Sequence, residues 1–186
     1  MMARIPDPDR SHLPAEGRQA LATLPDLALF RMLANAPTVI GPWLALGGTL
    51  LASLELPARR RELAILTVAH AGRCRYEWVQ HEAIAAASGV TAEEIASIAH
   101  DATSAVLDPG DAAVVRLAAE AVPDVEVSAE AIAAARAELG DRQTVELLCL
   151  VGYYVATAIV ARSAGIDIDQ PARLAVVDAS ERFAGR

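Results

Sequence analysis

Apolar residues recur along most of this chain at the spacing of an α-helix rather than that of a β-strand. The clearest case is the segment 58–71, where apolar side chains three and four positions apart share one face: Leu63, Leu66 and Ala69, with Ala64 and Val68. Pro57 fits the start of this helix and Gly72 its end. A second helix is expected over 74–88, ending at Gly89. Because the turn between them is short, we predict that the two helices pack as an antiparallel hairpin.

The same pattern predicts helices over the rest of the chain, joined by short turns. Thr91 and Glu94 form the capping box of a short helix that ends near His100. The other predicted helices cover about 18–35 with a break at Pro25, a stretch from about 42 in which Gly47 and Gly48 permit close backbone approach, and then 109–121, 128–140 and 141–163. Residues 1–17 are expected to form an N-terminal arm, and 18–186 a single all-α domain whose tail, 166–186, has room for one short helix.

The composition supports the all-α prediction and argues against several kinds of function. Hydrophobic residues make up 54% of the 186 residues and aromatic residues only 4%, because alanine and leucine, both strong helix formers, are abundant. The net charge is −8, and all 16 basic residues are arginine. An acidic chain without a basic stripe is a poor binder of nucleic acid. The absence of lysine excludes a Schiff-base mechanism.

The sequence predicts a cytoplasmic protein without a membrane partner. Its N-terminal residues lack the apolar core of a signal peptide. The longest apolar run, 147–161, lies between Glu146 and Arg162, and we interpret it as a buried core helix rather than a membrane span. Two cysteines, Cys74 and Cys149, without an export signal, indicate free thiols in a reducing compartment.

Candidate chemistry is concentrated in the stretch GRCRYEWVQH, residues 72–81. Cys74, Glu77 and His81 follow i, i+3, i+7 spacing, which places them on one face of a helix. Glu77 and His81 are one turn apart and can share a proton. The thiol of Cys74 is expected to have a lowered pKa, because of the helix dipole and the nearby histidine. A thiol, a carboxylate and an imidazole on one stripe can perform acid–base or nucleophilic chemistry.

Other interpretations of these residues stay open at this point. A Glu–x3–His pair also occurs on solvated helix faces, and a lone cysteine is commonly a small buried hydrophobe. Trp78 is expected in the core or at a subunit contact, with pocket lining as the alternative, and Tyr76 is a candidate hydrogen-bond donor in the site. Tyr153 and Tyr154 are expected in the core. No H-E-x-x-H motif or Cys/His cluster indicates a metal site, so we predict neither a metal ion nor a cofactor.

The block RRRELAILTVAHAGRCRYEWVQHEAIAAASGVTAEEI resembles the carboxymuconolactone decarboxylase family, which includes the alkylhydroperoxidase AhpD-like proteins. The resemblance covers the residues from Arg59 to about His100. It rests on a helix with R-E-L, a turn that contains glycine, and then Y-E-W-x-x-H and G-V-T-x-E-E-I. It implies an AhpD-like all-α fold with the predicted hairpin at its core. It also implies a homo-oligomer built from dimers or trimers.

In the peroxide-reducing branch of that family, the second helix of the hairpin carries C-x-x-C-x-x-x-H, and an upstream glutamate completes a proton relay. By position, the first cysteine corresponds to Cys74, the histidine to His81 and the upstream glutamate to Glu62. The second cysteine, which attacks the peroxide in that branch, corresponds to Glu77, so a two-cysteine cycle is not expected here. A cycle that uses Cys74 and an external thiol remains open.

The decarboxylase branch needs no cysteine pair. Its chemistry removes a carboxyl group from an unsaturated lactone acid without a cofactor, and this requires a proton donor at carbon. The resemblance offers Glu77, His81 and Glu62 as the acid–base groups. An arginine can hold a substrate carboxylate, although each candidate can equally be a solvated surface charge: Arg73, Arg75 and residues 59–61.

Three functions follow, all of them for a self-associating protein with a small-molecule ligand. The first is cofactor-free acid–base catalysis, such as decarboxylation, on a small lactone or carbonyl acid, with Glu77 and His81 handling the proton and Glu62 supporting them. The second is thiol-dependent peroxide reduction by Cys74. The third is a non-catalytic oligomeric binding protein that keeps the family fold.

Overall fold

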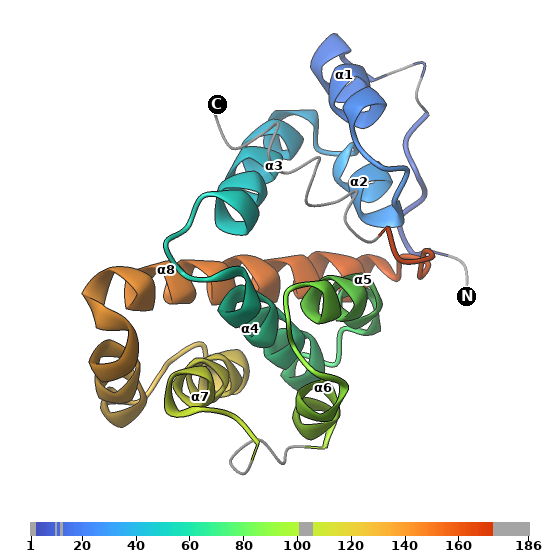
Figure 1. Cartoon of the computed structure of the whole chain (residues 1–186). Coiled ribbons are helices and arrows are strands. Elements are labelled where there is room, and N and C mark those ends of the chain that lie inside the picture. Colours follow the sequence, from blue (N-terminus) through green and yellow to red (C-terminus); the bar gives the residue numbers. More distant parts are fainter. Residues whose placement is uncertain (1–2, 10, 12, 101–105, 173–186) are drawn as a thin grey trace.

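The computed structural model describes residues 3–9, 11, 13–100 and 106–172. Within these residues the chain forms eight α-helices and no strand, which confirms the all-α prediction. Figure 1 shows α8 crossing the molecule, with α1–α3 on one side of it and α4–α7 on the other. The helices are α1 (Ala15–Thr23), α2 (Ala28–Leu33), α3 (Pro37–Ala52), α4 (Ala58–Ala71), α5 (Arg75–Ala87), α6 (Ala92–Ala99), α7 (Pro109–Asp124) and α8 (Ala129–Ala164).

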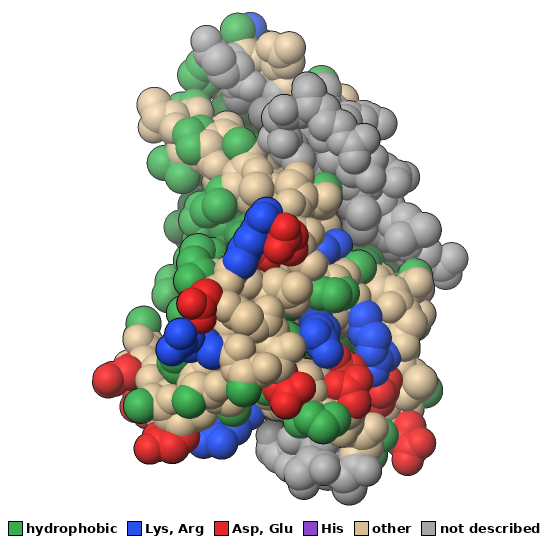
Figure 2. All heavy atoms as spheres, turned by 60° about the vertical axis from the view of Figure 1, so that its left-hand side comes forward, with side chains coloured by type: hydrophobic (Ala, Val, Ile, Leu, Met, Phe, Trp, Pro, Cys, Tyr) green, Lys and Arg blue, Asp and Glu red, His purple; other side chains and the backbone are tan. Residues whose placement is uncertain are grey.

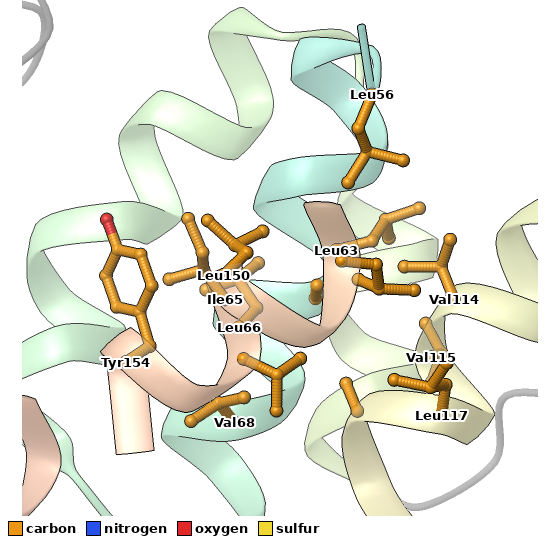
Figure 3. Packing of buried hydrophobic residues seen from close by; sticks show 14 of the residues in the cluster. Leu56, Leu63, Ile65, Leu66, Val68, Val114, Val115, Leu117, Leu150 and Tyr154 are labelled. Atoms are coloured by element: carbon orange, nitrogen blue, oxygen red, sulfur yellow. The ribbon is translucent and has the colours of Figure 1, made fainter. Parts of the chain in front are cut away.

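The predicted hairpin forms the centre of the fold. α4 packs against α5, and α7 and α8 also pack against α4. Every residue from 62 to 69 in α4 is buried, so the middle of this helix has no solvated face. Figure 3 shows its Leu63 and Leu66 side chains packed near Val114 of α7 and Leu150 of α8. Burying one aliphatic side chain of this size contributes about 2 kcal/mol, so this core holds the hairpin firmly in place.

Ion pairs fasten the beginning of α4 to α6 and α7. The guanidinium of Arg59 donates to Glu94 of α6 at 2.5 and 3.0 Å and to Asp111 of α7 at 2.9 Å. Arg60 donates to the other oxygen of Asp111 at 3.0 Å. Figure 2 shows that acidic and basic side chains are interspersed on the face it displays rather than gathered by sign. These contacts fix α6 and α7 relative to the hairpin.

The predicted break at Pro25 is confirmed, because the segment expected over 18–35 forms two helices, α1 and α2, with Pro25 in the gap between them. The predicted starts of two helices are wrong. α1 begins at Ala15, inside the predicted arm 1–17. α3 begins at Pro37 rather than near residue 42, since proline fits the first turn of a helix. These helices enclose a second, smaller apolar cluster of Leu13, Leu33, Ala34, Ile40 and Leu44.

α7 continues past the residue predicted to end it, whereas α8 divides where the sequence predicts. α7 includes Pro123, and the chain leaves it at Val125, which has a left-handed φ of 57°. α8 spans 36 residues, but its backbone is not helical at Gly140, with φ 77° and ψ 171°, so it consists of two helices that meet there, as predicted over 128–140 and 141–163. By length and composition alone α8 could cross a membrane, a test that soluble core helices also pass. The short helix expected in the tail lies mostly outside the described residues.

Candidate active site

A small cavity of about 70 Å³ lies between the helix hairpin, α8 and the N-terminal helices. Its apolar wall comes from residues 24–30 and from α3. Its polar groups come from α5 and α8: Tyr76, Glu77, Gln80, His81, Tyr153, Tyr154 and Thr157. Glu77 and His81, two of the four predicted catalytic residues, therefore face the same space, and Tyr76 joins them.

Glu62, the third predicted catalytic residue, lies behind His81. Oε2 of Glu62 is 2.9 Å from Nδ1 of His81, and both side chains are buried. The ring of Tyr154 packs edge-on against the imidazole, with centroids 5.0 Å apart and an interplanar angle of 88°. The expected partner of His81 was Glu77, one turn away on the same helix. Packing of α4 against α5 brings Glu62 to the ring instead, and leaves Nε2 as the nitrogen available to a molecule in the cavity.

The carboxyl group of Glu77 is buried without a charged partner in the part of the chain that the structure describes. Its side chain is 2% exposed, and neither oxygen has a hydrogen-bond partner among the described residues. A charged carboxylate is strongly disfavoured in such surroundings. Burial therefore raises the pKa of Glu77 from 4.5 to about 8, and the nearby thiol of Cys74 offsets this only in part. At neutral pH this glutamate is mainly a protonated acid, able to donate a proton.

Cys74 lies next to Glu77, as its spacing predicts, but it does not line the cavity. It is the N-cap of α5, with φ −93° and ψ 87°, so it precedes the helix that carries Glu77 and His81. The thiol is 1% exposed and belongs to an apolar cluster that includes Ala28 and Ala158. Burial, and then the charge of Glu77, raise the pKa of Cys74 to about 12. The expected low pKa is therefore wrong, because desolvation outweighs the helix dipole.

Arg73 and Trp78, the weaker binding candidates, line a different groove along α5 and α6. Trp78 is half-buried against the main core, and its ring lies edge-on to His70 with centroids 6.3 Å apart. Of the described residues that line the cavity of Glu77, none is an arginine. Within the same part of the chain, no group of three or more His, Cys, Asp or Glu side chains is arranged to hold a metal ion.

Sequence reasoning missed the α3 and α8 side of the site. Tyr154 is buried as predicted and Tyr153 is partly buried, but both also line the cavity, and burial raises the pKa of both phenols. The Tyr153 hydroxyl donates to the carbonyl of Trp43 at 3.3 Å, and the two rings pack 4.9 Å apart. Gly47 makes room for this arrangement, because a Cβ there would overlap the Tyr153 hydroxyl. The Gly47–Gly48 pair was the one sequence signal of this close approach.

The sequence and the fold of this chain were compared with those of known proteins. Residues 37–120 match the carboxymuconolactone decarboxylase family. No curated protein matches the sequence significantly. An AhpD-core, peroxidase-related protein of uncharacterized function from Ralstonia eutropha has a similar structure, with a TM-score of 0.77, 19% identity and 96% of each chain covered.

Two other solved structures are similar over nearly the whole chain. A peroxidase-related protein from a Silicibacter species has a TM-score of 0.73 at 17% identity, covering 99% of this chain and 95% of its own. A cysteine-to-alanine variant of the debrominase Bmp8, in complex with 2,3,4-tribromopyrrole, has a TM-score of 0.72 at 14% identity, covering 98% of each chain. At such identities the likeness shows the fold and leaves the activity to be argued from the site.

Fold and site together define an all-α protein whose central hairpin carries a buried acid and a glutamate-supported histidine. Residues 37–120 are similar to the carboxymuconolactone decarboxylase family, and the fold is similar to that of AhpD-like proteins. The family match extends beyond the Arg59–His100 block on which the sequence resemblance rests, and takes in α3 and most of α7.

Proposed function

We propose that this protein is an enzyme that transfers protons on a small, neutral carbonyl compound without a cofactor, with Glu77 and His81 as its acid–base pair. The observation that carries this proposal is the unpartnered, buried carboxyl group of Glu77 in a largely apolar cavity, one helical turn from His81. Such a carboxyl group destabilises the fold, so its position in a cavity indicates a role toward a ligand.

The two groups have complementary roles in this proposal. In this proposal Glu62 accepts a hydrogen bond from Nδ1–H of His81, and the Nε2 lone pair is the proton acceptor toward the cavity. Glu77, protonated at neutral pH, is the proton donor. A substrate between them loses a proton to Nε2 while the Glu77 carboxyl delivers its proton to a substrate carbon. Exchange with solvent then returns both groups to their starting states.

The lining of the cavity favours a neutral substrate. Apolar side chains from residues 24–30 and α3 form most of the wall, and the described lining includes no arginine. A substrate carboxylate would lose its hydration there without gaining an ion partner from Arg73, which lies in the other groove. A lactone or ketone therefore fits the cavity better than a free acid. Decarboxylation of a lactone acid is the narrower version of the proposal, and it would rely on His81 to hold the carboxylate.

Peroxide reduction by Cys74 is the second candidate function. Structural likeness to an AhpD-core protein favours it. The geometry of the thiol opposes it, because Cys74 is 1% exposed, has a raised pKa and does not line the cavity of Glu77 and His81. A thiol reacts with peroxide as the thiolate, which this environment disfavours.

Deuterium exchange provides a test that does not require the product to be known. The protein is incubated in D₂O with small lactones, ketones and β-keto acids, and loss of substrate C–H signals is followed by ¹H NMR. We expect the native protein to catalyse exchange of at least one compound, and Glu77→Gln or His81→Asn to slow it by about 100-fold or more. Glu82→Gln, on the exposed side of the same helix, is the matched control and should keep the native rate.

Cys74→Ser separates the two candidate functions. Under the acid–base proposal this variant retains carbon–hydrogen exchange. Turnover of hydroperoxide that disappears in Cys74→Ser and survives in Glu77→Gln would contradict the proposal and establish the thiol route. If neither variant changed any turnover while both altered ligand affinity, the protein would be a binding protein.

A further inference from the structure

One wall of the cavity is formed by α2, a helix much shorter than the others that line it. α3, α5 and α8 have 13 residues or more, whereas Leu29 and Phe30 in the wall belong to α2, which has six. A helix this short is not stable on its own in water. Its N-cap residue is Leu27, which makes no side-chain cap hydrogen bond. α2 therefore depends on other parts of the chain to stay formed and in place.

Asp169, in the segment that follows α8, supplies the missing cap. Its Oδ2 accepts a hydrogen bond from the backbone N–H of Ala28 at 2.6 Å, across 141 positions of sequence. Its Oδ1 lies 3.6 Å from Nη2 of Arg31, one turn further along α2. A carboxylate in this position satisfies a free N–H group and interacts favourably with the helix dipole. Arg31 also pairs with Asp7 and Asp26, which hold the exposed side of α2.

The same segment is attached to two cavity residues of α5. The hydroxyl of Tyr76 donates to Oδ2 of Asp169 at 3.3 Å. The side chain of Gln80 holds the backbone on both sides: Nε2 donates to the carbonyl of Asp169 at 3.2 Å, and Oε1 accepts from the N–H of Ala172 at 3.0 Å. Asp169 thus joins α2 to α5, and its α5 partners are residues that a ligand in the cavity would touch.

We propose that α2 is the movable wall of the cavity and that Asp169 is the positioning residue that holds it closed. The proposal rests on the proposed function only in taking this cavity as the place where substrate binds. Release of the Ala28 and Arg31 contacts frees Leu29 and Phe30 to move aside and admit a ligand. A ligand that competes for the Tyr76 hydroxyl acts on the same contact, which couples occupation of the cavity to the position of α2.

Amide hydrogen exchange, measured by mass spectrometry without any substrate, tests this proposal. In Asp169→Ala, exchange in α2 should become about tenfold faster, the effect of losing a helix cap of ordinary strength, while exchange in α4 and α5 stays native. Asp169→Asn keeps an acceptor for the Ala28 N–H and should restore near-native exchange. Asp167→Ala, at an exposed position of the same segment, is the matched control and should leave α2 unchanged.

Four results would overturn the proposal. The first is native-like α2 exchange in Asp169→Ala. The second is α2 amides that already exchange in the native protein as fast as those of an unstructured peptide. The third is equal acceleration in α2, α4 and α5, which would mean general destabilisation. The fourth is exchange in Asp169→Asn as fast as in Asp169→Ala. Because no substrate is present, none of these results depends on whether Glu77 transfers protons, and the D₂O test of Glu77 does not depend on α2.

Discussion

Two glutamates beside the central hairpin have opposite acid–base behaviour although both are buried. Glu94 accepts hydrogen bonds from the guanidinium of Arg59 and from the backbone of Thr91, and the Arg59 bond above all lowers its pKa to about 2. Glu77 has no hydrogen-bond partner among the described residues, and burial raises its pKa to about 8. Burial raises the pKa of a carboxyl group that has no charged partner, and hydrogen bonds from a cation outweigh this effect.

The two environments also separate stability from function. Around Glu94 and Asp111 each carboxylate meets an arginine, so the charges fasten α4, α6 and α7 together. Around Glu77 the fold places an acid in an apolar cavity and leaves it unpaired. A structural role fully explains the ion pairs around Glu94 and Asp111. It does not explain the acid in the cavity.

The largest predicted effect is on the pH dependence of stability in Glu77→Gln. Folded Glu77 keeps its proton up to about pH 8, whereas the unfolded chain loses it near 4.5. Between these values the folded state binds more protons, so the free energy of unfolding falls as pH rises. Between about pH 5 and about pH 9 the native protein should lose of the order of 4 kcal/mol relative to Glu77→Gln. Urea unfolding across this pH range measures the loss. The control Glu82→Gln should show the native dependence of unfolding free energy on pH. The same dependence in the native protein and in Glu77→Gln would refute the prediction.

Breaking the ion-paired region should have the next largest effect. Asp111→Ala removes the shared partner of Arg59 and Arg60, and truncating one side of a buried ion pair costs about 3 kcal/mol. Urea unfolding at neutral pH checks this value. Asp124→Ala, at the exposed end of α7, is the control and should be near neutral. A loss in Asp111→Ala no greater than in the control would show that these pairs do not fasten the helices.

Filling the α3 side of the cavity should destabilise the protein by about 2 kcal/mol, the usual scale of overpacking. Gly47→Ala places a Cβ against the Tyr153 hydroxyl, which must move toward the cavity. Gly41→Ala lies on the same helix with nothing within 4 Å of its added Cβ, so it should be neutral or slightly stabilising. Thermal unfolding of both variants measures the difference, and equal stabilities would show that Gly47 does not position Tyr153.

The smallest effect is expected at the cap of α6. Thr91→Ala removes the side-chain acceptor of the Glu94 N–H and should cost about 1 kcal/mol. Arg59 still holds the Glu94 carboxylate in this variant, so its low pKa should change little. Chemical unfolding gives the stability, with Thr49→Ala, an exposed threonine within α3, as the control. A loss several times larger would mean that the cap and the ion pairs form one cooperative unit.

The sequence predicted correctly those helix limits that are set by residues close to one another in the chain. The hairpin limits at Pro57 and Gly72, the capping box at Thr91 and the helix start at Pro109 all follow from residues next to one another in sequence. The errors occur where one signal competed with another. α3 begins at Pro37 rather than near residue 42, and α7 continues through Pro123, which was expected to end it.

The candidate site was predictable only on the helix that carries the motif. Glu77 and His81 share a face because both lie within α5, whereas Cys74 precedes the helix and does not line the cavity. The contacts of Tyr153 with α3 and of Asp169 with α2 join segments far apart in sequence, so no spacing rule points to them. Sequence spacing likewise cannot show that the Glu77 carboxyl group lacks a charged partner, because this depends on which side chains the tertiary structure places around it.

The measurement that tests the central claim most directly is the titration of Glu77 itself. The protein is labelled with ¹³C at glutamate carboxyl carbons, and its NMR spectrum is followed with pH beside that of Glu77→Gln, which identifies the signal by its absence. Our account predicts a carboxyl group that stays protonated at neutral pH and titrates at about 8. A Glu77 signal that titrates near the ordinary value of 4.5 would contradict the account, because the residue would then be an ionised carboxylate with a partner or with access to water.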